Sequence, residues 1–199
     1  MSNLNLSTRK YFSRFLLLIT VLSIHAFTQK ATGQSSYKST VGSQIKVNGT
    51  SNIHDWIMSA TNFNCEGSFL LKNDQLQDVT ALNFSLPVTN LKGKEDLLNK
   101  RAHKALKAEQ FSRITFQLTN ATVVAQQKSI KVTGNLTIAG VTKRVSIQTN
   151  YTVNGEELTC KGSQNIDMSD FNIKAPTFMM GALKVANEVT IDILLKLKN

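Results

Sequence analysis

The sequence predicts an all-β protein, either a closed antiparallel barrel or a sandwich, with one short helix inserted between strands. Three observations lead to this fold class. Apolar residues recur at every second position far more often than at helical spacing. The alternating runs number about eight, and an open sheet of that size would leave its edges unpaired. One segment, Glu95 to Gln110, follows helical spacing instead.

The N-terminal segment, residues 1–33, is predicted to be a signal peptide and is set apart from the fold. Basic residues open it, at Arg9, Lys10 and Arg14. Phe15 to Phe27 then forms an apolar stretch that is shorter than the roughly 20 residues of a membrane span. A small-x-small pattern that ends at Gly33 predicts cleavage before Gln34. Residues 34–199 therefore form a single mature domain.

The expected strands follow in order along that domain. Their alternating apolar residues centre on 45–47, 56–58, 63–69, 82–88, 114–118, 130–138, 145–153, 158–162 and 185–197. Gly49 and Gly67 mark bends in the early strands. Each run has one apolar face, as expected of strands that cover a common interior.

The helical exception has the charge order of a stable helix. Leu98, Ala102 and Leu106 recur at helical spacing. The acids Glu95 and Asp96 precede the basic residues, which matches the helix dipole. We expect a single short helix that lies across the barrel and is inserted between two strands.

Composition excludes several classes of protein. The chain has 199 residues, of which 41% are hydrophobic and 18% charged, so it is not disordered, and no apolar run is long enough for a polytopic membrane protein. Without residues 1–33 it keeps 19 basic and 13 acidic side chains. That excess suits a lipid headgroup, a phosphate or a solvated surface. No nucleic-acid partner is expected, because the basic residues are not interleaved with stacking aromatics.

Several stretches resemble the YceI-like family of secreted, lipocalin-like proteins, in matching order. They are GTSNIHDWIMSA (49–60), FSRITF (111–116), GNLTIAGVTKRVSI (134–147), DFNIKAP (170–176) and VTIDILLKL (189–197). The resemblance covers essentially the whole mature chain. It departs at Asn172, where the family usually has Gly, so the local backbone geometry there is open.

The resemblance implies a function as well as a fold. It implies an eight-stranded antiparallel lipocalin-like β-barrel whose elongated apolar interior holds a long-chain isoprenoid, quinone or similar amphiphile without covalent attachment. Residues 34–199 would be this YceI-like barrel domain, periplasmic or secreted, in a bacterium. No other cofactor is implied. Peripheral membrane contact, a monomer and a homodimer are all compatible with it.

Candidate ligand-binding residues are the large apolar side chains expected to face the interior or the barrel mouth, namely Trp56, Phe63, Phe84, Phe116, Phe178 and Met179. The alternative is an ordinary core or a packed plug. A polar headgroup would meet the basic helix at Lys100, Arg101 and Lys104. The alternative there is a solvated helix face.

No catalytic or metal-binding pattern accompanies these residues. The sequence lacks a Gly-x-Ser-x-Gly elbow, a His-x-x-x-His spacing and a glycine-rich phosphate loop, so no enzyme is expected. His54 and Asp55 are neighbours on an expected strand and would point to opposite faces. Cys65 and Cys160 form either a disulfide or two buried thiols, and the sequence leaves both open.

A second function remains open beside ligand carriage. The chain could instead be a stress-linked interaction module without enzyme activity, whose barrel is solidly packed and whose basic helix contacts an acidic partner or a membrane surface. The two hypotheses differ on whether the barrel encloses an apolar void.

Overall fold

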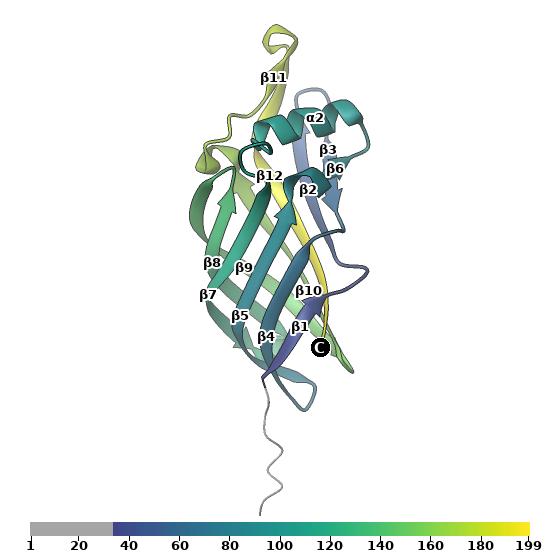
Figure 1. Ribbon diagram of the computed structural model, residues 1–199, viewed down its shortest axis with the longest axis vertical. Helices are drawn as coiled ribbons and strands as arrows, with labels where there is room; N and C mark the ends of the chain where they lie inside the picture. Colours follow the sequence, from purple (N-terminus) through teal and green to yellow (C-terminus); the bar gives the residue numbers. More distant parts are fainter. Residues whose placement is uncertain (1–33) are drawn as a thin grey trace, which may run out of the picture. The chain divides into compact units, whose positions relative to one another are not determined.

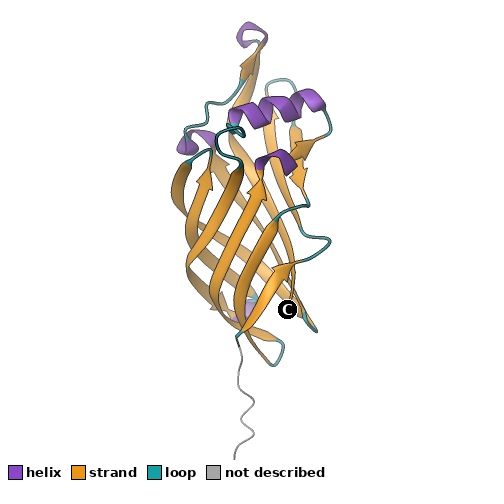
Figure 2. Cartoon of the chain, viewed as in Figure 1, coloured by secondary structure: helices purple, strands orange, loops and turns teal. Residues whose placement is uncertain are grey.

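The structure, a computed structural model, describes residues 34–199, and the predicted signal peptide, residues 1–33, lies outside the described residues. Strands dominate the described chain (Figures 1 and 2). In chain order its elements are β1 (Ser35–Ser39), β2 (Gln44–Ser51), β3 (Trp56–Ala60), β4 (Asn64–Lys72), β5 (Gln75–Pro87), the 3-10 helix η2 (Val88–Asn90), β6 (Lys92–Gly93), α2 (Asp96–Ala105), β7 (Arg113–Val124), η3 (Ala125–Gln127), β8 (Ser129–Ile138), β9 (Val141–Asn154), β10 (Glu157–Asp167), η4 (Met168–Phe171), β11 (Thr177–Phe178), η5 (Met179–Gly181) and β12 (Leu183–Lys198).

Eight strands of the described chain close into an antiparallel ring. Their order around the ring is β1, β4, β5, β7, β8, β9, β10 and β12. The ring closes where Lys38 of β1 pairs with Lys198 of β12. The expected eight-stranded antiparallel barrel with an inserted helix is therefore confirmed, and a sandwich is excluded. Strand β1 was missing from the expected series, because Tyr37 is its one buried residue and gives no alternating pattern.

Three members of the ring are interrupted and continue as second strands toward one end. Strand β2 continues β1 along β12, β3 precedes β4, and β6 follows β5. The interruptions fall at residues 40–43, 61–63 and 88–91. Beyond them, β2, β3 and β6 extend the wall toward α2. We call this end of the barrel the helix end and the opposite end the far end (Figure 1).

At the interruptions, where the backbone hydrogen bonds of the sheet stop, side-chain hydrogen bonds join the neighbouring segments. Ser43 Oγ donates to the Lys196 carbonyl at 3.1 Å and accepts from the Lys196 N–H at 2.9 Å. Ser39 Oγ accepts from the Cys65 N–H at 3.1 Å. Asn90 Nδ2 donates to the Asn62 carbonyl at 2.8 Å. Backbone groups that would otherwise lack partners are thereby satisfied.

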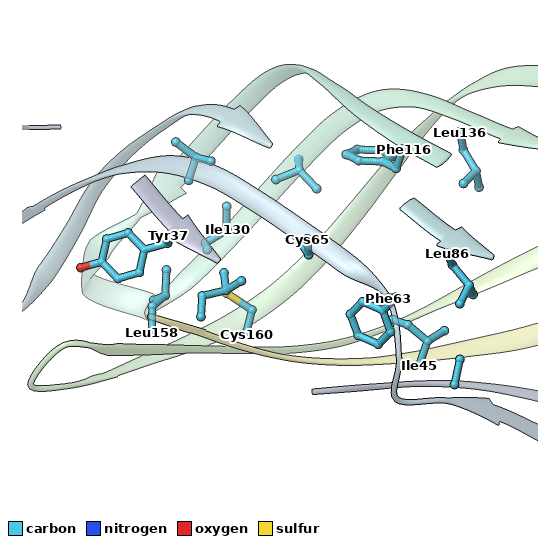
Figure 3. Close-up of a cluster of buried hydrophobic side chains, with 14 of the residues drawn as sticks. Tyr37, Ile45, Phe63, Cys65, Leu86, Phe116, Ile130, Leu136, Leu158 and Cys160 are labelled. Carbon is cyan, nitrogen blue, oxygen red and sulfur yellow. The ribbon is translucent and has the colours of Figure 1, made fainter. Parts of the chain in front are cut away.

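Large side chains fill the far end. Leu76, Leu158 and Leu197 are almost completely buried there. The Tyr37 and Phe69 rings meet edge to face with centroids 5.4 Å apart. Figure 3 shows part of this packing around Tyr37 and Leu158. The far end is therefore a packed plug.

Helix α2 is shorter than the expected range of 95–110. It ends at Ala105 because Lys107 takes a left-handed backbone, with φ of 53°. The Ala108 N–H donates to the His103 carbonyl at 2.9 Å, and the Lys107 N–H donates to the Lys104 carbonyl at 3.1 Å. This pair of bonds is a Schellman motif, which stops a helix even when its left-handed residue is not glycine.

None of the helices within residues 34–199 has the length and apolarity required to cross a bilayer.

Asn172, the departure from the family pattern, also adopts a left-handed backbone. It follows η4 with φ of 54° and ψ of 31°, and its side chain is exposed. Asparagine tolerates this region better than other residues with a side chain. The usual glycine and this asparagine therefore satisfy the same geometric requirement.

We predict that Asn172→Val destabilises the protein by about 1–2 kcal/mol, because a β-branched residue is strained in the left-handed region. Asn172→Gly is the matched control and should leave stability unchanged or slightly raised. Urea unfolding measures both. Equal stability of the two variants would contradict the left-handed assignment at this position.

Candidate functional site

Two cavities lie inside the barrel and meet end to end. The deep cavity has a volume of about 160 Å³, and the mouth cavity, toward the helix end, about 650 Å³. Six residues from six different segments line both cavities. We call them the collar: Val47, Leu91, Ile114, Ile138, Ile166 and Ile191. The barrel is therefore hollow from the mouth to the middle and packed beyond.

The deep cavity is almost wholly apolar. Its polar lining side chains are Thr149 and Gln164, and Gln164 Nε2 already donates to the Asn165 carbonyl at 2.9 Å. Such a wall offers a ligand burial of apolar surface and few directed hydrogen bonds.

Cys65 and Cys160 both line the deep cavity as free, buried thiols, so the alternative of a disulfide is not met. Figure 3 shows them among the apolar side chains of the core. The pKa of each thiol is raised to about 12, chiefly by burial, and the neighbouring Cys160 and Glu66 contribute to the raised pKa of Cys65. Both thiols are therefore protonated and unreactive at neutral pH.

The mouth cavity combines an apolar wall with a polar rim. The polar and charged residues that line it are Ser51, His54, Asp55, Lys94, Glu95 and Arg101. They come from the end of β2 and the turn that follows it, from the segment that leads into α2, and from α2 itself. The polar groups thus gather at one end of an otherwise apolar bore.

Trp56 lines the mouth cavity and lies directly over Gly49 of the paired strand β2. A Cβ atom at Gly49 would overlap the indole ring, so only glycine leaves room for the ring there. The indole Nε1 is buried and has no hydrogen-bond partner. Steric fit against β2 therefore sets the position of this ring.

Arg101 and Phe178 meet across the mouth. The Arg101 guanidinium lies 3.8 Å from the centroid of the Phe178 ring, a cation–π contact between α2 and β11. Helix α2 is itself fixed to the wall, because Asn99 Oδ1 accepts from the Gly93 N–H at 2.6 Å. His103 Nε2 lies 2.9 Å from the Leu91 carbonyl, so this nitrogen carries the proton and donates.

The structure brings most of the candidate ligand-binding residues to the bore. Phe84 and Phe116 line the deep cavity, whereas Trp56 and Phe178 line the mouth cavity. Phe63 lines neither. It packs behind Phe84, with ring centroids 5.3 Å apart. The side chain of Met179 is outside what the structure describes.

The candidate headgroup residues are divided by the structure. Arg101 lines the mouth cavity, whereas Lys100 and Lys104 are exposed and line neither cavity. Lys94, which belongs to the same run of basic residues but was not one of the three headgroup candidates, lines the mouth. The sequence feature that could have indicated this role is the position of Lys94 just before the helix, where the chain turns over the mouth.

The expectation for His54 and Asp55 was wrong, because they precede β3 in a turn and both line the mouth. The strand alternation that would separate them does not apply there. His54 Nδ1 contacts the Asp55 carbonyl at 2.9 Å and makes no carboxylate pair with it.

Comparison with known proteins identifies the family and the fold. The chain matches the YceI-like domain over residues 22–197. A crystal structure of BcnA from Burkholderia cenocepacia is similar, with a TM-score of 0.68 and 18% identity over 79% of this chain and 98% of that one. The YceI protein of Campylobacter jejuni has a TM-score of 0.57 and 16% identity over 69% and 83%.

A third similar structure is a polyisoprenoid-binding domain from Saccharophagus degradans, implicated in plant cell wall breakdown. Its TM-score is 0.63 and its identity 11%, over 83% of this chain and 99% of that one. No protein with a curated description matches the sequence. At these identities the solved structures establish the shared fold.

We predict that Gly49→Ala displaces Trp56 and costs about 1–3 kcal/mol of stability by overpacking. Trp56 is the one tryptophan of the chain, so its fluorescence emission reports the displacement directly. Thr50→Ala, at the exposed neighbouring position, is the control and should leave the spectrum unchanged. An unshifted spectrum in Gly49→Ala would show that the ring does not depend on the glycine.

We further predict that the two thiols make the protein lose stability at alkaline pH. Their folded pKa of about 12 exceeds the ordinary value of 9.0, so their contribution is complete below pH 9.0 and is lost as the pH rises toward 12. The slope is at most roughly 1.4 kcal/mol per thiol per pH unit.

The test is chemical unfolding between pH 8 and pH 11, roughly the window in which unfolded thiols ionise. The double variant Cys65→Ala, Cys160→Ala should show a flatter pH dependence than the wild type, whatever its absolute stability. Tyr37, whose pKa is raised by burial and by Glu156, titrates in both proteins and cancels. Parallel curves would contradict the buried thiols.

Proposed function

Because this chain belongs to the YceI-like domain family, we propose that its barrel binds a long-chain isoprenoid, quinone or similar amphiphile. The observation that carries the proposal is the pair of cavities that share the collar, one behind the polar rim and one deeper and apolar, in front of the packed far end. The similar Saccharophagus degradans domain, which its description calls polyisoprenoid-binding, supports the same class of ligand.

The dimensions of the bore support a bound small molecule. The mouth cavity alone, at about 650 Å³, falls within the roughly 300–1,000 Å³ of ligand sites. Apolar burial contributes roughly 25 cal/mol for each Å² removed from water. The chain of the ligand would lie along Trp56, Phe84 and Phe116.

The polar rim of the mouth cavity supports one orientation of the bound ligand, with its polar head at the mouth. A chain that fills the collar and the deep cavity leaves its polar head at the mouth, beside Arg101 and Lys94. We propose these two residues as the headgroup contacts, with Phe178 closing over the chain. Met179 remains a proposed contact on sequence grounds.

We propose a carrier or scavenger role without catalysis. The described residues contain no group of three His, Cys, Asp or Glu side chains placed to hold a metal. The carboxylates of the mouth, Asp55 and Glu95, lie at its polar rim. The signal-peptide prediction for residues 1–33 and the family support a periplasmic or secreted location.

The alternative of a solidly packed interaction module receives less support, because it requires a filled barrel and the bore is hollow. Its other premise, an exposed basic helix, is compatible with ligand carriage as well.

The experiment that tests the proposal is native mass spectrometry of the mature protein with polyprenols of increasing length. Wild-type protein should bind one molecule of a long polyprenol. We predict that Val47→Trp, which fills the collar, binds short polyprenols normally and long ones at least about tenfold more weakly. Loss of roughly 60 Å² of apolar burial is enough for that change.

Lys46→Trp is the matched control, since Lys46 neighbours Val47 on β2 but is exposed. It should bind every length as the wild type does. Retained binding of short polyprenols shows that Val47→Trp is folded. A wild-type protein that takes up no polyprenol, or a collar variant that binds all lengths equally, would overturn the proposal.

A further inference from the structure

The exposed apolar residues of the described chain gather at one end of the barrel. Of seven large apolar side chains that are exposed, five belong to the helix end: Ile53, Ile57, Leu97, Phe111 and Met180. The others are Val41, in an interruption of the wall, and Val124, at the far end. Single exposed apolar residues are ordinary, but their concentration around one opening marks an interaction surface.

The three most prominent of these residues stand on three segments at the helix end, two of which are joined, because Asn52 Nδ2 in the β2–β3 turn donates to the Ala182 carbonyl at 2.8 Å. Ile53 lies in the turn between β2 and β3, Leu97 in the first turn of α2, and Met180 at the tip of the β11–β12 hairpin (Figure 1). Ile53 and Leu97 are 59% and 55% exposed, and Met180 is fully exposed. A protein interface needs a contiguous packed core. A few exposed apolar side chains on projecting segments do not form such a core, but they are sufficient to insert into the headgroup region of a bilayer.

Charge on the same end has the sign that a lipid surface requires. Residues 92–107 contain six basic and two acidic side chains. The exposed lysines among them are Lys92, Lys94, Lys100, Lys104 and Lys107. Within residues 34–199 the one ion pair joins Lys196 to Glu157, so none of these lysines is held in an ion pair. Basic residues next to apolar ones attract anionic lipid headgroups.

We propose that the helix end docks on an anionic phospholipid bilayer. Ile53, Leu97 and Met180 enter the headgroup region, and the lysines of residues 92–107 contact the anionic headgroups. The mouth cavity then opens toward the bilayer, where a long-chain amphiphile dissolves. The purpose of docking, ligand transfer, rests on the proposed function, whereas docking itself does not depend on it.

The test is co-sedimentation of the mature protein with vesicles of phosphatidylglycerol and phosphatidylcholine, compared with phosphatidylcholine alone. Wild-type protein should bind the anionic vesicles, and added salt should weaken the binding. Lys100→Glu with Lys104→Glu should reduce affinity roughly 25-fold or more, at about fivefold for each lysine near the surface. Ile53→Asp with Met180→Asp should reduce it at least about tenfold.

The control is the double variant Val41→Asp, Val124→Asp, which makes the same chemical change away from the helix end and should bind as the wild type does. Unfolding midpoints check that every variant is folded. Absent binding of wild-type protein to anionic vesicles, or an equal loss in the control, would overturn the proposal.

Polyprenol binding in the absence of vesicles separates this proposal from the proposed function. None of the four substituted docking residues lines a cavity, so all variants should still load a polyprenol. Loading without vesicle binding contradicts docking alone. Vesicle binding without loading contradicts the carrier function and leaves docking standing.

Discussion

Closure of the ring on β12 is the constraint on which the rest of the structure depends. Both β1 and β2 pair with the same edge of β12, and Ser43 bridges the gap between them through two hydrogen bonds to Lys196. These partners are 153 residues apart, so the first and last parts of the domain must meet before the interior is sealed. Without closure, two strand edges and the apolar inner face would be open to water.

The arrangement of the strands in the wall, rather than the amino-acid composition of the wall, explains why the bore is hollow. An eight-stranded barrel is just wide enough for its side chains to fill it. At the far end they do, with Leu76 and Leu158 completely buried. Toward the helix end β2, β3 and β6 extend the wall, and the Trp56 ring packs closely against Gly49 of the paired strand. The mouth cavity lies at this end.

The sequence was sufficient to predict the all-β class, the inserted helix and most strands, because alternation is a local property that burial on one face imposes. It did not predict the interruptions at 40–43, 61–63 and 88–91, whose hydrogen bonds join residues far apart in sequence. Phe63 was therefore misplaced as a cavity residue. It lies in one interruption and packs behind Phe84. Lys94 belongs to the run of basic residues around the helix but was not one of the three headgroup candidates. A helical pattern identifies a basic face, but the path of the preceding segment decides which cation reaches the mouth.

The two ends of the barrel are chemically unequal, and this inequality gives the bore a direction. The far end is sealed by large buried side chains, and its turns expose polar residues such as Asn73 and Glu156. The helix end joins an open apolar cavity to exposed apolar tips and unpaired lysines. The proposed amphiphile would therefore enter at the helix end, chain first if its head is to remain at the polar rim. A bilayer presents lipid heads outward, so such a ligand would have to withdraw and turn at the mouth. The contact between Arg101 and Phe178 spans the mouth and joins α2 to the β11–β12 hairpin, whereas paired strands close the wall, so this contact is where the ligand would have to pass.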